Sequence, residues 1–396
     1  MAFQEKGELK MESNNTLRAA MRYIAGAVRA LKYGEPAPEL PSELSWNKVF
    51  ALAKGHSLAS TVWYILEPAV RADLKENEEL RSLCDRWEGQ RGIDYAKNLV
   101  QTAEFSSLTQ LFSENEIKFL PMKGFIFKRL WARPEHRTMA DMDFCVEEKD
   151  MQRVADLLIA RGYHPEMEDG VVHDTFDKPP YLHVEIHKSL FVGSKDTFDT
   201  WVPKEDNPYW YEMLPHDLLT FNVGHIYKHF VGGGCGARSL FDVYLYLEER
   251  GEGIDRAALE DALREKELSD FYKKLLHLVY FWYGDGSFPF EPDPRFIKGG
   301  KPTEELLEME YFIITGGSYG SEENRVKYAL SKKSRLAYAL ELAFPKYYVM
   351  KAHYPVLKYC PILLPLLYPI RWISYLFNGK VKRFFGYFFG KKKTKK

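Results

Sequence analysis

The sequence predicts an α+β fold in which a small mixed β-sheet is flanked by N-terminal and C-terminal helical regions. Apolar residues recur every three or four positions over 14–110 and again over 215–283, as in amphipathic helices. Between these stretches lie short apolar or alternating runs of the kind that form strands. The composition, 45% hydrophobic and 28% charged, is that of a folded protein with a large core.

The chain of 396 residues divides into four parts. We expect an N-terminal helical region over 1–114, an α/β core over 115–210, a C-terminal helical domain over 211–350, and an apolar, then basic, tail over 351–396. The helix patterns of the first part are LRAAMRYIAGAVRALK, LSWNKVFALAKGHSLASTVWYIL and NLVQTAEFSSLTQLFSEN.

The α/β core alternates between strand and helix patterns. In YLHVEIHKSL (181–190), apolar and polar residues alternate, which predicts a strand with one polar face. Gly162 marks the end of a helix pattern that begins at residue 147. The expected order is strand, helix, strand, helix, strand, strand, over residues 117–122, 125–132, 139–146, 147–163, 163–168 and 181–190.

Asp141 and Asp143 are the first candidates for chemistry. Their spacing on a predicted strand puts both carboxylates on one face, with the Cα atoms roughly 7 Å apart, while Met142 and Phe144 point into the core. Two neighbouring carboxylates repel each other and are costly beside apolar packing. A divalent cation removes this conflict, and Mg²⁺ prefers such oxygen ligands together with substrate phosphates.

Glu185 is the third candidate, on the polar face of the alternating strand. If this strand lies beside that of Asp141 and Asp143, three carboxylates converge. Three acids can hold two metal ions about 4 Å apart, the arrangement that serves in-line phosphoryl or nucleotidyl displacement. The two aspartates would then be metal ligands, and Glu185 would bind the catalytic metal or take the proton of the acceptor.

Lys123, Gly124 and Arg137 are candidates for phosphate binding. Lys123 and Gly124 lie between a predicted strand and a predicted helix. A glycine there lets the backbone approach a phosphate, and a helix N-terminus favours an anion. Lys123 can add a positive charge, and Arg137, four residues before Asp141, can hold a phosphate from the other side.

These segments resemble the nucleotidyltransferase superfamily of the DNA polymerase β type, and more closely a bacterial family of uncharacterised nucleotidyltransferases. The matching segments are LPMKGF (120–125), RTMADMDF (137–144), GYHP (162–165), HVEIH (183–187), HIYKHF (225–230), RSLFDV (238–243) and, ahead of them, WNKVFALAKGH (46–56). The resemblance covers most of the chain to about residue 250 and is faint beyond it.

The resemblance implies transfer of a nucleoside monophosphate from an NTP to an acceptor, with two Mg²⁺ ions. It implies phosphate-loop positions for Lys123 and Gly124, and metal-binding and catalytic positions for Asp141, Asp143 and Glu185. The acceptor is left open among a small hydroxylated molecule, a sugar, a lipid-linked intermediate and a protein side chain. In the wider superfamily the phosphate loop usually has Gly-Ser, whereas this chain has Lys-Gly-Phe and offers no hydroxyl there.

Two other functions remain open at this point. The missing hydroxyl favours a non-catalytic nucleotide-binding or membrane-associated scaffold on a degenerate transferase fold, whereas the intact acids oppose it. A zinc hydrolase is the other alternative, because His225 and His229 share a helix face and can form a site with Asp242. We expect these histidines instead to pack near the cleft, where Arg238 contacts nucleotide or pairs with Asp242.

Charge is unevenly distributed along the chain. From Lys380 to the end there are eight Lys or Arg residues and no acid, which leaves about −9 for the rest of a chain whose net charge is −1. Such a body lacks the basic face of a nucleic-acid-binding protein, so no specific nucleic acid is expected as a partner.

The tail over 355–396 predicts contact with an anionic membrane surface. PILLPLLYPIRWISYLF (361–377) is strongly apolar, but its three prolines argue against a continuous helix. The following VKRFFGYFFGKKKTKK mixes aromatic and basic residues, as interfacial segments do.

The compartment is predicted from the cysteines and the first residues. The four cysteines are far apart and form no C-x-x-C pair, which indicates free thiols in a reducing compartment. The first fifteen residues lack the apolar segment of a secretory signal. We therefore expect a cytoplasmic protein, with peripheral binding to the inner membrane face as a further expectation from the tail.

Overall fold

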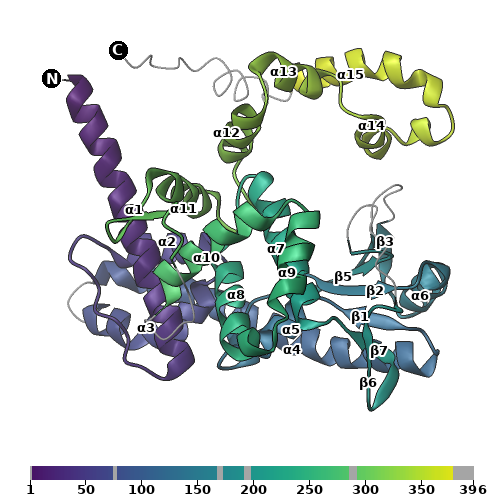
Figure 1. Cartoon of the computed structure of the whole chain (residues 1–396), viewed down its shortest axis with the longest axis horizontal. Coiled ribbons are helices and arrows are strands. Elements are labelled where there is room, and N and C mark those ends of the chain that lie inside the picture. Colours follow the sequence, from purple (N-terminus) through teal and green to yellow (C-terminus); the bar gives the residue numbers. More distant parts are fainter. Residues whose placement is uncertain (1, 75–77, 167–172, 191–197, 285–291, 378–396) are drawn as a thin grey trace.

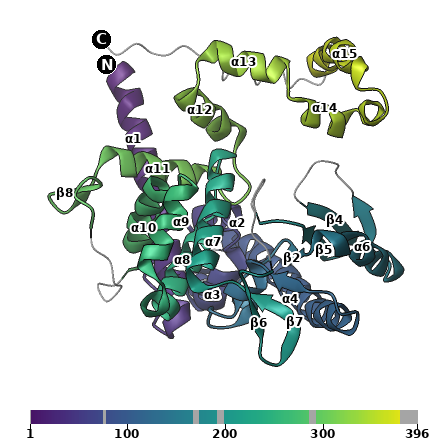
Figure 2. The ribbon, with the colours of Figure 1, turned by 45° about the vertical axis from the view of Figure 1, so that its right-hand side comes forward.

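The protein is described here from a computed structural model, over residues 2–74, 78–166, 173–190, 198–284 and 292–377. The predicted α+β class is confirmed, because a mixed β-sheet lies beside two groups of helices that precede and follow it in the chain (Figure 1). A further run of helices near the C-terminus projects away from both groups (Figure 1, Figure 2).

Four helices form the N-terminal group: α1 (Ala2–Tyr33), α2 (Trp46–Gly55), α3 (Ala59–Leu74) and α4 (Arg81–Glu114). Ser45 starts α2, because its side chain accepts the amide N–H of Lys48 and so satisfies one of the unpaired donors of the first turn. Helices α1, α2 and α3 pack on one another, whereas the second half of α4 runs along the sheet (Figure 1).

Seven strands form one sheet in the order β3-β4-β5-β2-β1-β7-β6. Their bounds are β1 (Phe119–Pro121), β2 (Met142–Val146), β3 (His164–Glu166), β4 (His173–Lys178), β5 (Leu182–His187), β6 (Val202–Lys204) and β7 (Asn207–Glu212). The pairs β2–β5 and β1–β7 are parallel and the other pairs are antiparallel. The four strands expected from the sequence are β1, β2, β3 and β5, and the other three were not predicted.

The two faces of the sheet pack into different cores. Met142 and Phe144 face a core formed with α4 and with α6 (Met151–Ala160), as the sequence predicted. Cys145 and Leu120 belong instead to the larger core on the opposite side. Because side chains alternate along a strand, Asp143 projects towards that second side. The short helix α5 (Gly124–Lys128) covers the same side, directly after β1.

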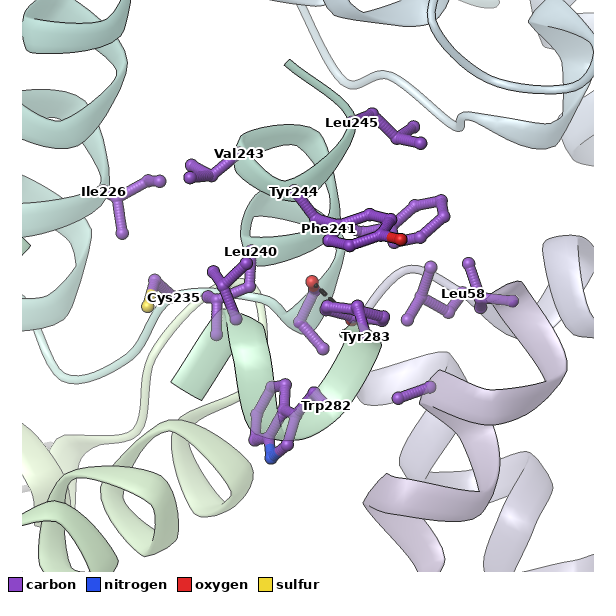
Figure 3. Packing of buried hydrophobic residues seen from close by; sticks show 14 of the residues in the cluster. Leu58, Ile226, Cys235, Leu240, Phe241, Val243, Tyr244, Leu245, Trp282 and Tyr283 are labelled. Carbon is purple, nitrogen blue, oxygen red and sulfur yellow. Dashed lines mark hydrogen bonds between the residues drawn. The ribbon is translucent and has the colours of Figure 1, made fainter. Parts of the chain in front are cut away.

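The C-terminal group shares its core with the N-terminal helices. Its helices are α7 (Pro215–Val231), α8 (Ala237–Arg250), α9 (Arg256–Glu265), α10 (Ser269–Tyr283) and α11 (Glu304–Gly316), with a small hairpin of β8 (Ile297–Lys298) and β9 (Lys301–Pro302) before α11. Leu58, just ahead of α3, lies in one buried cluster with Phe241 and Tyr283 (Figure 3). The helices before and after the sheet are therefore packed as one body.

A helical arm follows α11, and consists of α12 (Glu322–Lys332), α13 (Arg335–Ala343), α14 (Tyr347–His353) and α15 (Leu364–Phe377). The expectation that prolines prevent a helix over 361–377 is wrong for most of that segment. Pro365 stands in the first turn, where no amide N–H is needed, and α15 continues through Pro369. The basic end of the tail, 378–396, lies outside the described residues. No helix in the described part of the chain combines the length and apolarity that crossing a bilayer requires.

Candidate active site

The candidate site is built on the face of the sheet formed by β2, β5 and β4. Strands β2 and β5 are parallel neighbours, and their register places Asp143 beside Glu185 and Cys145 beside His187. Strand β4 pairs with β5 on its other edge, with His173 opposite His187. Because residues paired across strands point to the same side, these side chains share one face.

Asp141, Asp143 and Glu185 come together on this face. One carboxylate oxygen from each lies within 4.8 Å of the others. Asp141 immediately precedes β2 and is half-buried, whereas Asp143 lies within the strand and is 4% exposed. The structure thus places Glu185 beside the two aspartates, the juxtaposition on which the prediction from the sequence depended.

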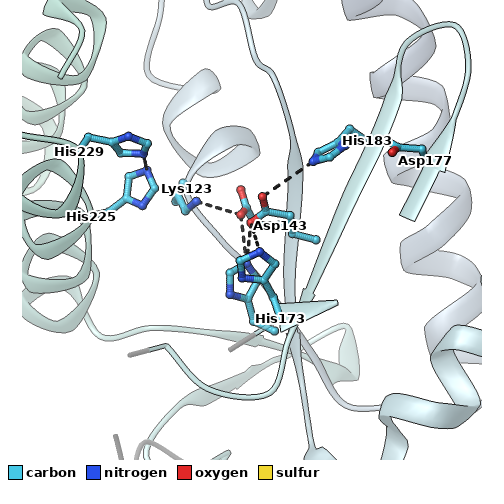
Figure 4. Close-up of polar contacts among 9 residues, drawn as sticks. Lys123, Asp143, His173, Asp177, His183, His225 and His229 are labelled. Carbon is cyan, nitrogen blue, oxygen red and sulfur yellow. Dashed lines mark hydrogen bonds and ion pairs between the residues drawn. The ribbon is translucent and has the colours of Figure 1, made fainter. Parts of the chain in front are cut away.

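Two cationic or polar groups contact the buried carboxylate of Asp143. The ammonium nitrogen of Lys123 lies 2.9 Å from its Oδ1 atom (Figure 4). Nε2 of His187 is 3.2 Å from the same Oδ1 atom and 3.2 Å from Oε2 of Glu185. Lys123 and His187 therefore supply the partners that make burial of these acids tolerable.

Repulsion and burial act differently on the two aspartates. The pKa of Asp141 is raised by the charge of Asp143 and by burial. Burial would also raise the pKa of Asp143, but Lys123 and the hydrogen bond to His187 hold it below its ordinary value. Asp143 is thus the firmly ionised member of the pair, and Asp141 is the member that takes up a proton more readily.

The three acids fit a divalent cation in the chemistry of their donor atoms. All three offer carboxylate oxygens, the ligands that Mg²⁺ prefers. Oδ2 of Asp143 is buried and has no hydrogen-bond partner, and a buried polar atom in that state calls for an explanation. A cation bound between the acids would supply that missing partner.

Lys123 and Gly124 lie at the turn from β1 into α5, as predicted, but their environment differs from that of a phosphate loop. Lys123 has a φ of 30°, a strained value that tends to persist at functional sites. A Cβ atom on Gly124 would lie 2.3 Å from Sδ of Met139, so a larger residue there would need the Met139 side chain to move. Helix α5 is only five residues long, so its dipole adds little attraction for an anion.

Arg137 is buried and paired with Asp242 of α8. Its Nε and Nη2 atoms donate to the two carboxylate oxygens at 2.8 and 2.7 Å, and Nη1 donates to the carbonyl of Gly124 at 3.3 Å. Trp131 also donates to Asp242, at 2.9 Å. This arrangement favours a role in joining the Lys123–Gly124 turn to α8 over the expected contact with a phosphate.

Arg238 and the two histidines of α7 are the remaining candidates, and of these His229 is exposed whereas Arg238 and His225 are partly buried. Arg238 donates to Thr138, and its Nε atom is buried without a partner. His225 and His229 contact each other, with their Nε2 atoms 2.9 Å apart (Figure 4). Asp242 is occupied by Arg137 and Trp131, so the zinc group proposed from these two histidines and Asp242 does not form among the described residues.

Sequence patterns gave no indication of His173 as part of the site. It lies on β4, which was not predicted, and its Nε2 atom is 3.8 Å from Oε2 of Glu185. His187 was noted only as a neighbour of Glu185 on the same face. Both histidines are identified by the register between β4 and β5, which pairs His173 with His187. This pairing cannot be predicted from the sequence.

Comparison with known families gives one match. Residues 42–284 match the model of a family described as uncharacterised nucleotidyltransferase, which covers more than half of the chain and all of the candidate site. No curated protein matches the chain.

Comparison with solved structures gives a weak likeness. The antibiotic-resistance factor ANT(2'')-Ia matches 44% of this chain and 97% of its own chain, at 8% sequence identity and a TM-score of 0.35. A TM-score this low does not bear on the fold or the activity of the present chain.

Proposed function

Because the chain belongs to the uncharacterised nucleotidyltransferase family, we propose that it transfers a nucleoside monophosphate from an NTP to a hydroxyl-bearing acceptor with the help of Mg²⁺. Asp141, Asp143 and Glu185 would hold the metal. The observation that carries this proposal is the meeting of the three carboxylates around a buried, unpartnered oxygen of Asp143. Two Mg²⁺ ions bound there would supply positive charge at the attacking and leaving oxygens of an in-line displacement.

In the proposed reaction, an acceptor oxygen bonds to the α-phosphorus of the NTP. The bond from that phosphorus to the bridging oxygen breaks, and pyrophosphate leaves. Burial would raise the pKa of Glu185, but hydrogen bonds to His183 and His187 hold it well below its ordinary value. So acidic a carboxylate favours the ligand role of Glu185 over the base role, and the acceptor proton then passes to water.

Lys123 and Arg238 are the side chains that we assign to the triphosphate. Lys123 is next to the acids and keeps its charge, because Asp143 and Asp141 outweigh the effect of burial and raise its pKa. Arg238 has a buried Nε atom without a hydrogen-bond partner, beside Thr138 at the entrance to the phosphate-loop segment. Together they would make the contacts to the triphosphate that the Lys-Gly-Phe loop, which has no hydroxyl, does not make.

The first test measures nucleotide binding and transfer. Calorimetry with each of the four NTPs, with and without Mg²⁺, is expected to show Mg²⁺-dependent binding by the wild type. Asp141→Asn and Asp143→Asn are expected to lower transfer at least a hundredfold, since each removes a metal-ligating charge. Asp174→Asn is the matched control, because Asp174 lies on β4 but points to the opposite face. Full transfer by both site variants would refute the assignment.

A second candidate function is a nucleotide-binding scaffold without transfer activity. The absence of a hydroxyl in the Lys-Gly-Phe loop favours it. Measurement of pyrophosphate release separates the two, because a scaffold binds NTP yet releases no pyrophosphate with any acceptor class, whether a sugar, a small alcohol, a lipid-linked intermediate or a protein.

We also propose that the helical arm binds an anionic membrane surface. Ile362, Leu366, Ile370 and Ile373 form a stripe along α15 and the turn before it, and they are 53–82% exposed. Over the whole arm, residues 322–377, the sequence has nine Lys or Arg residues and three acids, so the arm carries a net positive charge. Apolar side chains beside basic ones suit the boundary between lipid headgroups and acyl chains.

Liposome co-sedimentation tests this second proposal. The wild type is expected to sediment with vesicles that contain phosphatidylserine and to stay in solution with neutral phosphatidylcholine vesicles. Changing both Leu366 and Ile370 to Asp should weaken sedimentation at least tenfold, because each charge would enter the apolar layer. Ile93→Asp is the control, since Ile93 is 53% exposed but lies on α4, away from the arm. Sedimentation that the arm variant leaves unchanged would contradict the proposal.

A further inference from the structure

We propose that His173, His187 and Glu185 form a second metal site, which takes a divalent transition metal of the zinc or manganese kind. The inference rests on the proposed function in one respect, because Glu185 would belong to both this group and the Asp141–Asp143 group. The two sites would then hold unlike ions, one bound by oxygen atoms alone and one bound by nitrogen and oxygen.

The sheet register builds this second group. His173 on β4 is paired directly with His187 on β5, so both imidazoles project from the same face. Their ring centroids are 4.7 Å apart. Glu185 lies two residues before His187 on the same strand, and therefore on the same face. The three side chains are 10–19% exposed, which shields a bound ion from most of the solvent while leaving a path for its entry.

The distances between the donor atoms suit a common ion. Nε2 of His187 and Nε2 of His173 are 3.2 and 3.8 Å from Oε2 of Glu185, and one donor atom from each residue lies within 4.8 Å of the others. Two ligand atoms about 2.1 Å from a metal, at a tetrahedral angle, are themselves roughly 3.4 Å apart. The observed separations lie on either side of this value, so small side-chain adjustments would complete the site.

The donor atoms set the class of metal. Imidazole nitrogen is a ligand for Zn²⁺ and other transition metals, whereas Mg²⁺ is bound by oxygen. The Asp141–Asp143–Glu185 group has no nitrogen donor, and the His173–His187–Glu185 group has two. Side chains on one face of a sheet therefore offer two kinds of site, with Glu185 as the carboxylate between them.

The polar contacts of His187 are compatible with metal binding. Its Nε2 atom is equally near to Oδ1 of Asp143 and Oε2 of Glu185, at 3.2 Å from each. A ring N–H can donate well to only one of these acceptors. Lys123 also donates to Oδ1 of Asp143, so that oxygen keeps a partner when Nε2 of His187 binds a metal ion.

Cobalt binding tests the second site. The full chain, stripped of metal with a chelator, is titrated with CoCl₂ while visible absorption and metal content are measured. We expect Co²⁺ at both groups, and excess Mg²⁺ should displace only the fraction at the aspartates. The Co²⁺ that remains should show the visible bands of nitrogen coordination. His173→Ala should weaken this Mg²⁺-resistant binding at least tenfold, whereas His164→Ala should not, because His164 is an exposed histidine on the neighbouring strand β3.

Circular dichroism checks that the variants are folded. A second variant, His173→Asn, is expected to weaken Mg²⁺-resistant Co²⁺ binding as His173→Ala does. Mg²⁺-resistant Co²⁺ bands that both variants leave unchanged, or their absence from the wild type, would overturn the second site. The measurement needs no turnover. Normal Co²⁺ bands without nucleotide transfer would refute the proposed function alone, and transfer without these bands would refute the second site alone.

Discussion

Asp143 carries its charge at a position that is 4% exposed, inside a strand that packs on both faces. Its two oxygens have different surroundings, since Oδ1 contacts Lys123 and His187 while Oδ2 has no partner. The spacing of acids on a predicted strand was enough to place Asp143 and Asp141 on one face. It did not reveal that Lys123 would contact Asp143, because a lysine that binds a carboxylate and one that binds a phosphate look alike in a sequence.

The pairing of Arg137 with Asp242 shows a limit at the same scale. The two residues are 105 positions apart, and nothing in the pattern around either one selects the other. Arg137 was therefore assigned to a phosphate, the most common partner of an arginine near such a motif. In the structure, Arg137 is buried and connects the Lys123–Gly124 turn to α8, and it donates to both carboxylate oxygens of Asp242.

Arg137→Ala is expected to lower the free energy of unfolding by about 3–5 kcal/mol, because it leaves the buried carboxylate of Asp242 without its cation. Urea unfolding followed by circular dichroism measures this loss. Arg71→Ala is the control, since the Arg71–Glu88 pair is 43–47% exposed and solvent screening is expected to make its contribution much smaller. Equal losses in both variants would show that the buried Arg137–Asp242 pair stabilises the protein no more than an exposed pair does.

At the scale of elements, helices were easier to predict than strands. Strand β5 was found because apolar and polar residues alternate along its sequence, and its burial follows that alternation up to Ile186, after which His187 is buried as well. Strand β7 was missed since it contains Pro208 and aromatic residues on both faces, and β6 since it is three residues long with Pro203 at its centre. Strand β4 has mainly polar residues, so its sequence shows no strand pattern. It is a strand because it pairs with β3 on one edge and with β5 on the other.

The turn between α7 and α8 is another element whose role depends on distant contacts. Gly234 lies against Gly316, at the end of α11, so closely that a Cβ atom on Gly234 would be 2.6 Å from the Cα atom of Gly316. The two atoms nearest to that Cβ position are the Cα and carbonyl carbon of Gly316. Both belong to the backbone, so they cannot move aside as a flexible side chain can. The glycine-rich run 232–236 is therefore a packing surface for the segment that leads into the arm.

Gly234→Ala is expected to destabilise the protein by about 1–3 kcal/mol, because the added methyl group overpacks this backbone contact. Thermal unfolding measures the change. Gly251→Ala is the matched control, because a Cβ atom there meets nothing within 4 Å and the φ of −57° suits alanine. A Gly234→Ala variant as stable as this control would contradict the close approach.

Across the whole molecule, His56 joins helices that are far apart in the chain. Its Nδ1 atom accepts the amide N–H of Ala237, at the start of α8, at 3.0 Å. Its Nε2 atom lies 3.1 Å from the carbonyl of Ile314 in α11 and donates to it. His56 stands in the turn after α2 and is completely buried. Its two partners could not be predicted, because they depend on how the helical groups dock.

This burial makes the stability of the protein depend on pH. Burial lowers the pKa of His56 to about 4 from an ordinary value of 6.5. Between these values the unfolded chain binds a proton that the folded chain does not. The free energy of unfolding should therefore fall by roughly 3 kcal/mol as pH drops from 6.5 to 4. Urea unfolding across this range measures the loss.

The His56→Gln variant separates this contribution from others. Burial also lowers the pKa of His136 and His229 to about 4, and it lowers the pKa of His173 and His225, so the wild type should show the summed pH dependence of these histidines. His56→Gln should be less stable at pH 7 and should depend on pH less steeply, by about one proton. The exposed His164→Gln should follow the wild type throughout. Identical slopes for all three proteins would rule out the neutral, buried state of His56.

The packing of α1 against α10 and α11 also has a consequence for synthesis on the ribosome. The guanidinium of Arg18 in α1 donates to the carbonyl of Leu307, which is translated 289 residues later. At about 5–20 residues per second, this interval lasts on the order of 15 to 60 seconds. During that time α1 can pack on α2 and α3, but the part of its surface that meets α10 and α11 has no final partner. Exposure of this part to aggregation therefore lasts until the last helices of the body emerge.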